Sequence, residues 1–428
     1  MKKLTALLLS VAMVISLCAC GSAAAETADT AAATEEAQAE TADTAAATEE
    51  AAPAAEAAGV TVKAGFICLH DENSTYDLNF INGAKAACES LGIEYVIKTN
   101  IPEGQECYEA ALDLADDGCN FIFADSFGHE DYMIQAAMEL PEVQFAHATG
   151  TKAHTEGLAN FHNAFASIYE GRYLAGVVAG MKLNEMIEAG EITEDQAKMG
   201  YVGAFTYAEV ISGYSSFYLG AKSVCPSVTM DVTFTGSWYD ETAEKEGANT
   251  LIKNGAVLIS QHADSMGAPT ACETAGVPNV SYNGSTASAC PNTFLVSSRI
   301  DWTPYFEYCI KCIQNGEEII TDYTGTLETG SVVLTDLGQN VAAGTAEALE
   351  VLKSDIMAGK VKVFDTNTFT VDGAKLESYM ADVDTDPEYA GDHEVIVDGE
   401  FVESGDGLRS APYFNVNIDG ISLLDTAF

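Results

Sequence analysis

Short apolar runs alternate with stretches of helical periodicity along most of the chain. Residues 60–69 form an apolar run of strand length, and residues 84–91 continue it with small and apolar residues at helical spacing. The alternation then predicts a strand at 94–98, a helix at 106–116, a strand at 121–125, a helix at 132–140 and a strand at 143–148. Gly92, Gly118 and Pro141 lie where these helices should end. Such alternation predicts a parallel sheet with helices on both faces.

The same pattern begins again in the second half of the chain. It predicts helices at 169–182, 210–224, 242–254 and 270–275, and strands at 199–204, 229–234, 256–261 and 277–282. Two consecutive blocks of this kind imply an α/β protein with two similar, doubly wound lobes and a cleft between them.

Polar and aromatic residues follow several of the predicted strands. Ligands of doubly wound sheets bind beyond the carboxyl ends of the strands. Those ends are Leu69-His70-Asp71, Asp125-Ser126-Phe127, Ala204-Phe205-Thr206-Tyr207, Gly236-Ser237-Trp238-Tyr239-Asp240 and Gln261-His262-Ala263-Asp264. Any single polar residue there is as readily a helix cap. Five ends with the same chemistry favour a common binding cleft.

The first residues have the pattern of a secretion signal. Lys2 and Lys3 precede an apolar stretch at 4–17, which is short for a membrane span and ends in Cys18-Ala19-Cys20. Residues 17–21, LCACG, resemble the lipobox of bacterial lipoproteins. We expect a signal peptide at 1–19 and a lipid on Cys20, which would anchor the protein on the extracytoplasmic face of the cell membrane.

Residues 20–59 are rich in Ala, Thr and Glu. AETADTAAATEEA occurs at 25–37 and again at 39–51, and residues 21–59 hold nine acidic residues and no basic ones. Such a composition cannot bury a core, so we expect a disordered tether.

Charge and cysteine content limit the classes of partner. Without Lys2, Lys3 and the nine tether acids, 17 basic and 56 acidic residues remain, a net charge of −39. This charge repels nucleic acid and anionic headgroups. The nine cysteines after Cys20 are odd in number and mostly lie in apolar stretches, so we expect buried, mostly reduced thiols. Cys309 and Cys312 have redox-motif spacing but lie in the middle of a predicted helix, which favours a core role.

Four long segments resemble the basic membrane protein (BMP) family, the purine-nucleoside-receptor-like substrate-binding lipoproteins of ABC importers. They are 118–150 (GCNFIFADSFGHEDYMIQAAMELPEVQFAHATG), 169–180 (YEGRYLAGVVAG), 200–211 (GYVGAF and AEVI) and 236–265 (GSWYDETAEKEGANTLIKNGAVLISQHADS). The resemblance runs from about residue 62 to 302. It implies the type I periplasmic-binding-protein fold, with two Rossmann-like lobes and three hinge crossovers around the ligand, and binding without catalysis. It also implies ABC permease and ATPase subunits as partners.

The sequence departs from that family in two places. The first loop of characterised nucleoside receptors resembles Asp-x-Ser-Phe-Asn-Asp, whereas residues 71–77 read DENSTYD; Ser74 and Asp77 match, and Tyr76 supplies a ring. Arg299 stands where those receptors carry a lysine. The expected organisation is a first lobe at 60–160 with about 297–322, and a second lobe at 161–296 with about 323–428. The segment 409–414, RSAPYF, lies beyond the resemblance and suggests no function.

A purine needs apolar ring faces for its base and acceptors for its amino or hydroxyl donors. The expected ligand-binding residues are Asp71, Ser74, Tyr76, Asp77, Ser126, Phe127, Tyr207, Trp238, Asp240, Asp264 and Arg299. Trp238 is as readily a core residue, and Asp240 a cap for the helix that follows it. Asp264 follows a strand apolar enough to be central. Arg299 would either donate to the ligand or pair with a cleft carboxylate.

Motifs for catalysis, phosphate binding and zinc are absent from the sequence. It contains no G-x-S-x-G, G-x-x-x-x-G-K-[ST] or H-E-x-x-H, and its seven histidines lack metal-ligand spacing. We therefore expect no catalytic residues, metal or cofactor. Three alternatives stay open: a sensor or surface lipoprotein, a receptor for a sugar or riboflavin-like ring, and a nucleoside-cleaving enzyme that uses two cleft aspartates.

The lipid anchor can be tested by one substitution. Cys20→Ala should release the mature protein into the medium, because the lipid is the only membrane-binding element that the sequence predicts. Fractionation of cells into membrane and medium measures this. Membrane retention of the variant would contradict the prediction.

Overall fold

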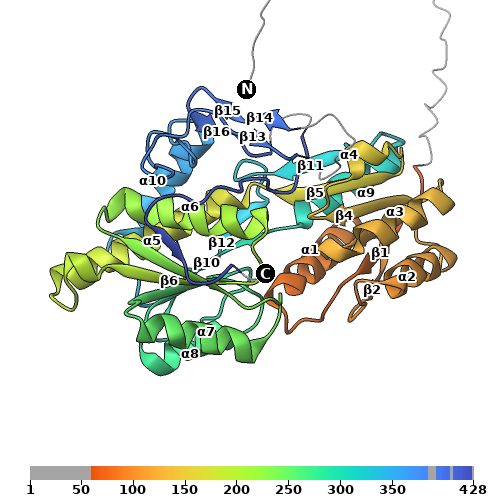
Figure 1. Ribbon diagram of the computed structural model, residues 1–428. Helices are drawn as coiled ribbons and strands as arrows, with labels where there is room; N and C mark the ends of the chain where they lie inside the picture. The colour runs from red at the N-terminus through yellow and green to blue at the C-terminus, as the bar shows by residue number, and fades with distance from the viewer. Residues whose placement is uncertain (1–58, 384–391, 405–407, 427–428) are drawn as a thin grey trace, which may run out of the picture. The chain divides into compact units, whose positions relative to one another are not determined.

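The computed structural model describes residues 59–383, 392–404 and 408–426, which contain two large, mostly parallel sheets (Figure 1). The first has the strand order β11-β5-β4-β3-β1-β2 and the second β12-β10-β9-β8-β6-β7-β17. The order β2-β1-β3-β4-β5 therefore recurs as β7-β6-β8-β9-β10. Each sheet is doubly wound about its first strand, which confirms the prediction of two similar α/β lobes. The expected signal peptide, Cys20 and most of the tether lie outside the described residues.

The first lobe follows the predicted alternation closely. Its strands are β1 (Lys63–Ile67), β2 (Glu94–Lys98), β3 (Phe121–Ala124), β4 (Gln144–Ala148), β5 (Phe161–Ala166) and β11 (Asp322–Gly325). Its helices are α1 (Thr75–Leu91), α2 (Gln105–Asp116), α3 (Glu130–Glu139), the short α4 (Ala153–Glu156) and α9 (Thr303–Asn315), with a 3₁₀ turn at Phe127–His129. A core of Ile67, Leu114 and Phe145 lies under α2 and α3, whereas Phe66, Phe80 and Trp302 pack with α1 and α9.

In the second lobe α5 and α6 cover one face of the sheet, and α7 and α8 cover the other (Figure 1). Its strands are β6 (Lys198–Gly203), β7 (Thr229–Phe234), β8 (Leu258–His262), β9 (Asn279–Tyr282), β10 (Phe294–Ile300), β12 (Val332–Leu334) and β17 (Ile421–Leu423). Its helices are α5 (Ile168–Glu188), α6 (Ala208–Val224), α7 (Glu241–Lys253), α8 (Gly267–Ala275) and α10 (Thr345–Met357), with a 3₁₀ turn at Glu194–Gln196. Two small hairpins follow α10, formed by β13 (Met380–Ala381) with β14 (His393–Glu394) and by β15 (Ile396–Val397) with β16 (Glu400–Phe401).

Helix α1 begins earlier than the apolar periodicity indicated. Ser74 is its N-cap, and the Ser74 side chain accepts a hydrogen bond from the backbone N of Asp77 at 3.2 Å. Gly92, in the left-handed conformation, ends the helix. The cap converts the loop at 71–77 into a first helical turn, which fixes the positions of Tyr76 and Asp77.

The chain crosses between the sheets after β5, after β10 and after β11. These points differ from the expected lobe boundaries. Strand β5 (Phe161–Ala166) belongs to the first sheet, although residues 161 onward were assigned to the second lobe. Residues 297–300 of β10 belong to the second sheet, and β11 continues in the first sheet to Gly325. Apolar periodicity identifies a strand but not the sheet in which it pairs, so it could not place these crossings.

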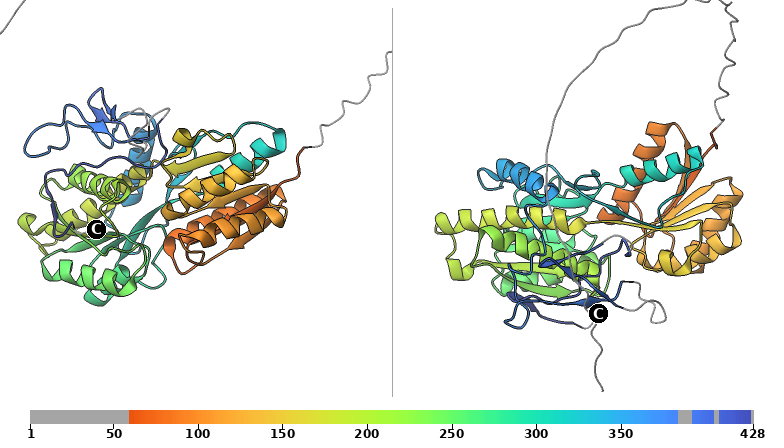
Figure 2. Two further views of the ribbon diagram at one scale, coloured as in Figure 1. Left: turned by 45° about the vertical axis from the view of Figure 1, so that its right-hand side comes forward. Right: turned by 90° about the horizontal axis from the view of Figure 1, so that it is seen from above.

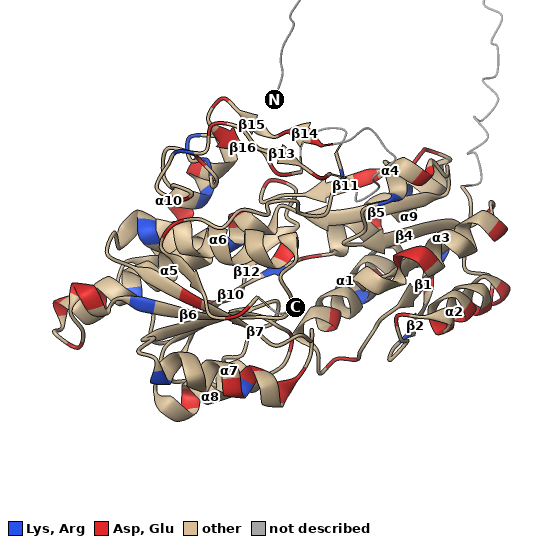
Figure 3. Ribbon diagram, in the orientation of Figure 1, with Lys and Arg blue, Asp and Glu red and all other residues tan. Residues whose placement is uncertain are grey.

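Side-chain exposure and charge agree with the expectations from composition. All nine cysteines in the described residues are buried. Acidic residues lie on the helices of both lobes, where Lys and Arg are fewer (Figure 3). Among the described helices, none combines the length and apolarity that a bilayer crossing requires.

Helices α5 and α6 pack closely because glycines face backbone at their contact. A Cβ on Gly176 would overlap the Phe217 carbonyl oxygen, and one on Gly220 would overlap that of Tyr173. Only a residue without a side chain permits this approach, which accounts for the small residues in the segment YEGRYLAGVVAG.

Gly176→Ala should lower the free energy of unfolding by about 1–3 kcal/mol, because the added methyl group forces two helix backbones apart. Gly247→Ala is the matched control. It lies within α7, where a Cβ would meet Thr233 Cγ2 at an ordinary 3.4 Å. The control should raise stability by about 0.5–1 kcal/mol through helix propensity alone. Chemical denaturation of both variants measures the difference, and equal effects would contradict this account of the packing.

Candidate functional site

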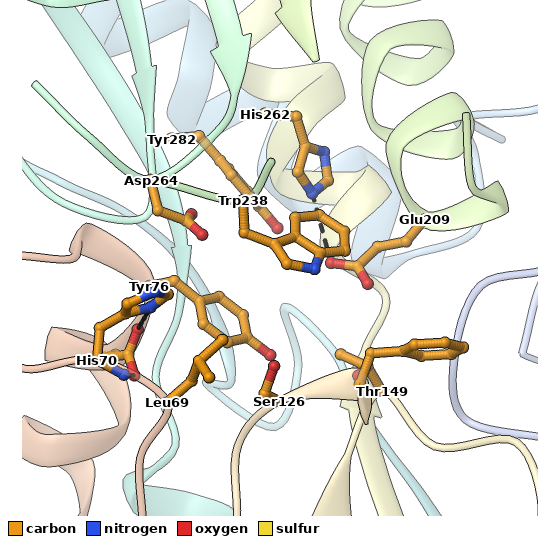
Figure 4. A pocket seen from close by; sticks show the side chains of 12 residues that line it. Leu69, His70, Tyr76, Ser126, Thr149, Glu209, Trp238, His262, Asp264 and Tyr282 are labelled. Carbon is orange, nitrogen blue, oxygen red and sulfur yellow. Dashed lines mark hydrogen bonds and ion pairs between the residues drawn. The ribbon is translucent and has the colours of Figure 1, made fainter. Parts of the chain in front are cut away.

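A pocket lies between the carboxyl ends of the two sheets (Figure 4). Twelve residues line it: Leu69, His70, Tyr76, Asp77, Ser126, Phe127, Thr149, Glu209, Trp238, His262, Asp264 and Tyr282. Residues 69–70 follow β1 and residues 126–127 follow β3, while Glu209 follows β6 and residues 262 and 264 come from the end of β8. In each sheet, these are the neighbouring strands from which the chain winds in opposite directions. The pocket therefore joins the switch points of both sheets.

The first lobe offers ring faces to the pocket. The Tyr76 hydroxyl donates to the carbonyl oxygen of Asp125 at 2.8 Å, and its ring packs on Phe80 at 4.8 Å between centroids. Because the hydroxyl is already paired, Tyr76 presents mainly its ring. The Ser126 hydroxyl is likewise paired, since it donates to Glu103 Oε1 at 2.6 Å.

On the first-lobe side of the pocket, the buried carboxyl groups of Asp77 and Asp125 lie close to the thiol of Cys68. The backbone N of His70 donates to Asp77 at 2.7 Å, and the His70 ring lies 3.3 Å from the same carboxylate. Burial would raise the pKa of Asp77, but hydrogen bonds from His70 and Ser74 outweigh it, and that pKa is lowered. Burial, and then the charge of Asp77, raises the pKa of Asp125 well above its usual range. Asp125 therefore holds its proton more strongly than Asp77 does.

Cys68, Asp77 and Asp125 have ligand atoms within 4.8 Å of one another, the spacing of a metal site. Burial, followed by Asp125, raises the pKa of the Cys68 thiol well above its usual range. A metal ion binds the thiolate, not the thiol. Hydrogen bonds of Asp125 with Cys68 and Asp77 also join the three groups to one another beneath the pocket.

The second lobe contributes an indole and a histidine–glutamate pair. Trp238 is half-buried and meets Phe205 edge to face at 5.1 Å between centroids. His262 Nε2 lies 3.4 Å from Glu209 Oε1. Burial lowers the pKa of His262, although Glu209 opposes this, so the imidazole is neutral. The pair therefore presents one net negative charge, on Glu209.

Asp264 both faces the pocket and joins the lobes. Its carbonyl oxygen accepts hydrogen bonds from the backbone N and the hydroxyl of Thr75 in α1, at 3.1 and 3.2 Å. Its carboxyl group accepts from Asn283 Nδ2 at 3.4 Å. Burial, and then Asp77, raises the pKa of Asp264 well above its usual range. A ligand that donated hydrogen bonds here would stabilise the ionised form.

Two hydroxyls in the pocket have no hydrogen-bond partner among the described residues, Tyr282 Oη and Thr149 Oγ1. Tyr282 ends β9, and its ring lies over the guanidinium of the buried Arg172 at 4.9 Å. Arg172 also donates to Tyr201 Oη at 2.8 Å and to Ser260 Oγ at 3.0 Å. These bonds hold the guanidinium in place against the Tyr282 ring. An unpaired buried hydroxyl costs free energy that a ligand can recover.

The structure brings six of the predicted site residues into this pocket: Tyr76, Asp77, Ser126, Phe127, Trp238 and Asp264. It places the other five elsewhere. Ser74 caps α1, and Asp240 caps α7 by accepting from the backbone N of Ala243 at 2.9 Å. Asp71 accepts from the backbone and side chain of Asn73 in its own turn. Arg299 lies beside Asp301 at 3.3 Å, and Tyr207 lies in an adjoining hollow.

Six lining residues were not among the predicted site residues: Leu69, His70, Thr149, Glu209, His262 and Tyr282. His70 and His262 were recognised as strand-end residues, but that signal is weak for a single histidine. Thr149 and Tyr282 follow or end predicted strands, so the strand-end rule alone would have found them. Glu209 lies in the first turn of a helix, where acidic residues are common, and nothing in the sequence distinguishes it.

Comparison with known proteins identifies the family. Residues 68–366 match the family described as ABC transporter substrate-binding protein PnrA-like (Bmp), which is more than half of the chain. A purine-binding protein of Brucella abortus is 31% identical over 260 residues, which cover 60% of this chain and 69% of that protein. A Haloferax volcanii protein, provisionally named as a glucose-binding protein of an ABC transporter, is 31% identical over 248 residues. That match covers 58% of this chain and 60% of the Haloferax protein, so it spans less than two thirds of that relative.

Solved structures agree on the fold. A solute-binding protein of an ABC transporter system from Conexibacter woesei has a TM-score of 0.57 at 18% identity, covering 71% of this chain and 98% of that chain. A similar protein from Aeropyrum pernix has a TM-score of 0.57 at 19% identity, covering 70% and 92%. The two lobes thus have the expected type I periplasmic-binding-protein fold. The matched family consists of substrate-binding proteins, which bind a solute and are not enzymes. The chain belongs to the Bmp family of PnrA-like ABC transporter substrate-binding proteins.

Proposed function

We propose that this protein captures a purine nucleoside or nucleobase between its two lobes and delivers it to the permease and ATPase subunits of an ABC importer. The observation that carries the ligand class is the combination in one pocket of aromatic faces, a buried carboxyl group and two hydroxyls that lack a partner among the described residues. Trp238 and Tyr76 supply ring faces from opposite lobes, and Asp264 supplies a buried carboxyl group. The purine-binding relative in Brucella supports the same ligand class.

A flat ring is the ligand shape that best suits these walls. Tyr76 is held by its paired hydroxyl, and Trp238 is held by the rings of Phe205 and Tyr207. Both rings are therefore fixed before the ligand arrives, which lowers the entropic cost of binding. Every nucleobase has an apolar face that such rings can stack on.

The polar groups of the pocket match the donors of a purine or its ribose. Asp264 and Asp77 can accept hydrogen bonds from amino or hydroxyl groups, and charge-assisted bonds of this kind are about twice as strong as neutral ones. The unpaired hydroxyls of Tyr282 and Thr149 can donate to ring nitrogens or to a carbonyl oxygen. The net charge of the site disfavours phosphorylated ligands, because Asp77 and Glu209 line it and no Lys or Arg does.

The proposed place of action is the extracytoplasmic face of the cell membrane, with the protein attached through a lipid on Cys20. Its support is the lipobox-like sequence LCACG at 17–21 together with a family of transport receptors. A tether of about 40 residues would allow the binding domain to reach the permease from that anchor.

Calorimetric titration with purines, pyrimidines, ribose, glucose and riboflavin tests the ligand class directly. A purine nucleoside or nucleobase should bind most tightly and should raise the melting temperature, because it binds only the folded protein. Tight binding of a sugar alone would contradict the purine proposal and leave the transport role intact.

Trp238→Ala should weaken binding of the best purine by about 5- to 150-fold, since base stacking on an aromatic ring contributes roughly 1–3 kcal/mol. Trp238→Phe should retain most of the affinity because it keeps a ring in place. Titration of the two variants separates stacking from packing. If Phe and Ala weakened binding equally, Trp238 would not be a stacking residue.

Asp264→Asn should weaken binding by about 1–3 kcal/mol, because it replaces a carboxyl oxygen that faces the pocket by an amide donor and leaves a buried ligand donor without its acceptor. Asp240→Ala is the control from the same lobe. It should remove a helix cap, which lowers the free energy of unfolding by about 1 kcal/mol and therefore lowers the melting temperature. It should leave the affinity for the purine unchanged. Calorimetry and thermal unfolding of both variants give the comparison, and an unchanged affinity of Asp264→Asn would show that the carboxylate does not contact the ligand.

A further inference from the structure

A second hollow adjoins the pocket and shares four of its lining residues, Phe127, Thr149, Glu209 and Trp238. It is the roomier of the two spaces. We call the two spaces the inner pocket and the outer compartment. The ring of Phe127 from the first lobe lies 5.8 Å from that of Tyr207 in the second, so these rings stand where the two spaces meet. The four shared residues therefore make the two spaces direct neighbours.

The C-terminal segment builds the far wall of the outer compartment. Tyr379, Asp382, Asp392, Arg409 and Tyr413 line it, and all lie beyond residue 366, where the family match ends. The C-terminal residues, dark blue in Figure 2, lie against the second lobe, where β17 pairs with β7. This wall is therefore an addition to the family's common fold.

Hydrogen bonds fix the segment to both lobes. The buried Glu403 carboxylate accepts from Ser212 Oγ of α6 at 2.6 Å and from the backbone N of Phe414 at 2.6 Å. The backbone N of Ser410 donates to Asp322 of β11, in the first lobe, at 3.2 Å. A stack of Phe414 on Phe364, at 4.2 Å between centroids, adds an apolar core. The wall is thus built into the fold and is not a loose tail.

The polar groups of the outer compartment include carboxylate acceptors and two donors that have no partner among the described residues. Glu209, Asp382 and Asp392 contribute carboxylates. Arg409 is 5% exposed and donates to the carbonyl oxygens of Ala411 and Pro412, but its Nη1 has no partner among the described residues. A buried guanidinium N–H without an acceptor costs free energy, so a ligand acceptor beside Arg409 would be stabilising. The Thr149 hydroxyl is also unpaired and is shared with the inner pocket.

We propose that the outer compartment binds a glycosyl group attached to a nucleoside, in addition to the ribose of that nucleoside, while the flat ring of the same ligand occupies the inner pocket. The proposal rests on the proposed function and adds a glycosyl group to the ligand. A hydroxyl group can donate to a carboxylate and accept from the Arg409 N–H, whereas an amine or a phosphate satisfies only one of these partners. The rings of Tyr207, Tyr379 and Trp238 add apolar surface for a sugar face.

Electrostatics separates this ligand from a nucleotide. Three carboxylates and one guanidinium leave the outer compartment with a net negative charge, which repels a phosphate group. A neutral glycosyl group carries no such penalty. Relative to one parent nucleoside, its glycosylated form should therefore bind more tightly and its phosphorylated form more weakly.

The test compares a purine nucleoside with derivatives that carry a pentosyl or hexosyl group on the 5′ oxygen or on the exocyclic amine, and with its 5′-monophosphate. Calorimetry on the whole mature protein gives the ratio of the parent's Kd to that of each derivative. At least one glycosylated compound should bind about tenfold more tightly than its parent, and the monophosphate more weakly. In Asp382→Asn/Asp392→Asn this glycosyl ratio should fall to within about twofold of unity, because two charged acceptors are lost.

Asp398→Asn is the matched control. Asp398 is exposed in the turn between β15 and β16, at a φ of 50° that asparagine also adopts, and it lines neither space. The control should keep the full glycosyl ratio. The proposal is overturned if no glycosylated compound binds more tightly than its parent, if the monophosphate binds best, or if the control loses the ratio as well. Failure of every purine to bind would instead refute the proposed function, and this inference with it.

Discussion

The arrangement of the site depends on the winding order of the two sheets. In each, the chain starts at one strand and adds neighbours on both sides, so β1 and β3 diverge in the first lobe and β6 and β8 in the second. The loops after diverging strands turn away from each other and leave a crevice at the carboxyl edge. Because both lobes have the same order, two crevices face one another, and the inner pocket receives side chains from the segments after all four strands, including Glu209 in the first turn of α6. This shared winding order is enough to bring the side chains from these segments together.

The cost of burying polar groups in that crevice explains the chemistry that it holds. Asp125 and Asp264 have strongly raised pKa values because burial disfavours their charged forms. Tyr282 Oη and Thr149 Oγ1 have no partner among the described residues. A protein that needed only stability would satisfy these groups or replace them with apolar ones. Their presence together in one pocket is the physical reason to consider it a binding site, independent of any relative.

Local patterns in the sequence predicted the elements and part of the site. Alternating strands and helices gave the two lobes, and the apolar strand before Asp264 is indeed central, since β8 lies in the middle of the second sheet. Asp240 shows the limit of the strand-end rule, because the same residue type in the same place is a helix cap. Arg299 and Glu209 show another limit. Whether such a side chain faces the cleft depends on sheet pairing and helix rotation, which a linear pattern does not encode. The wall that contains Tyr379, Asp382 and Arg409 depends on contacts of Glu403 with α6 and of Ser410 with β11, 191 and 88 residues away along the chain, and no local signal reports them.

Asp264 connects ligand capture to the contact between the lobes. Its carbonyl oxygen accepts from Thr75 at the start of α1, while its carboxyl group faces the inner pocket a few bonds away. A second bridge, from Asn79 Nδ2 to Asn283 Oδ1 at 3.3 Å, ends on the residue that also donates to the Asp264 carboxyl group. A ligand that orders this carboxyl group therefore also orders the loop that bridges the lobes. Binding and lobe closure then share one set of hydrogen bonds, so a ligand that contacts Asp264 favours the closed arrangement over any in which these bridges are broken.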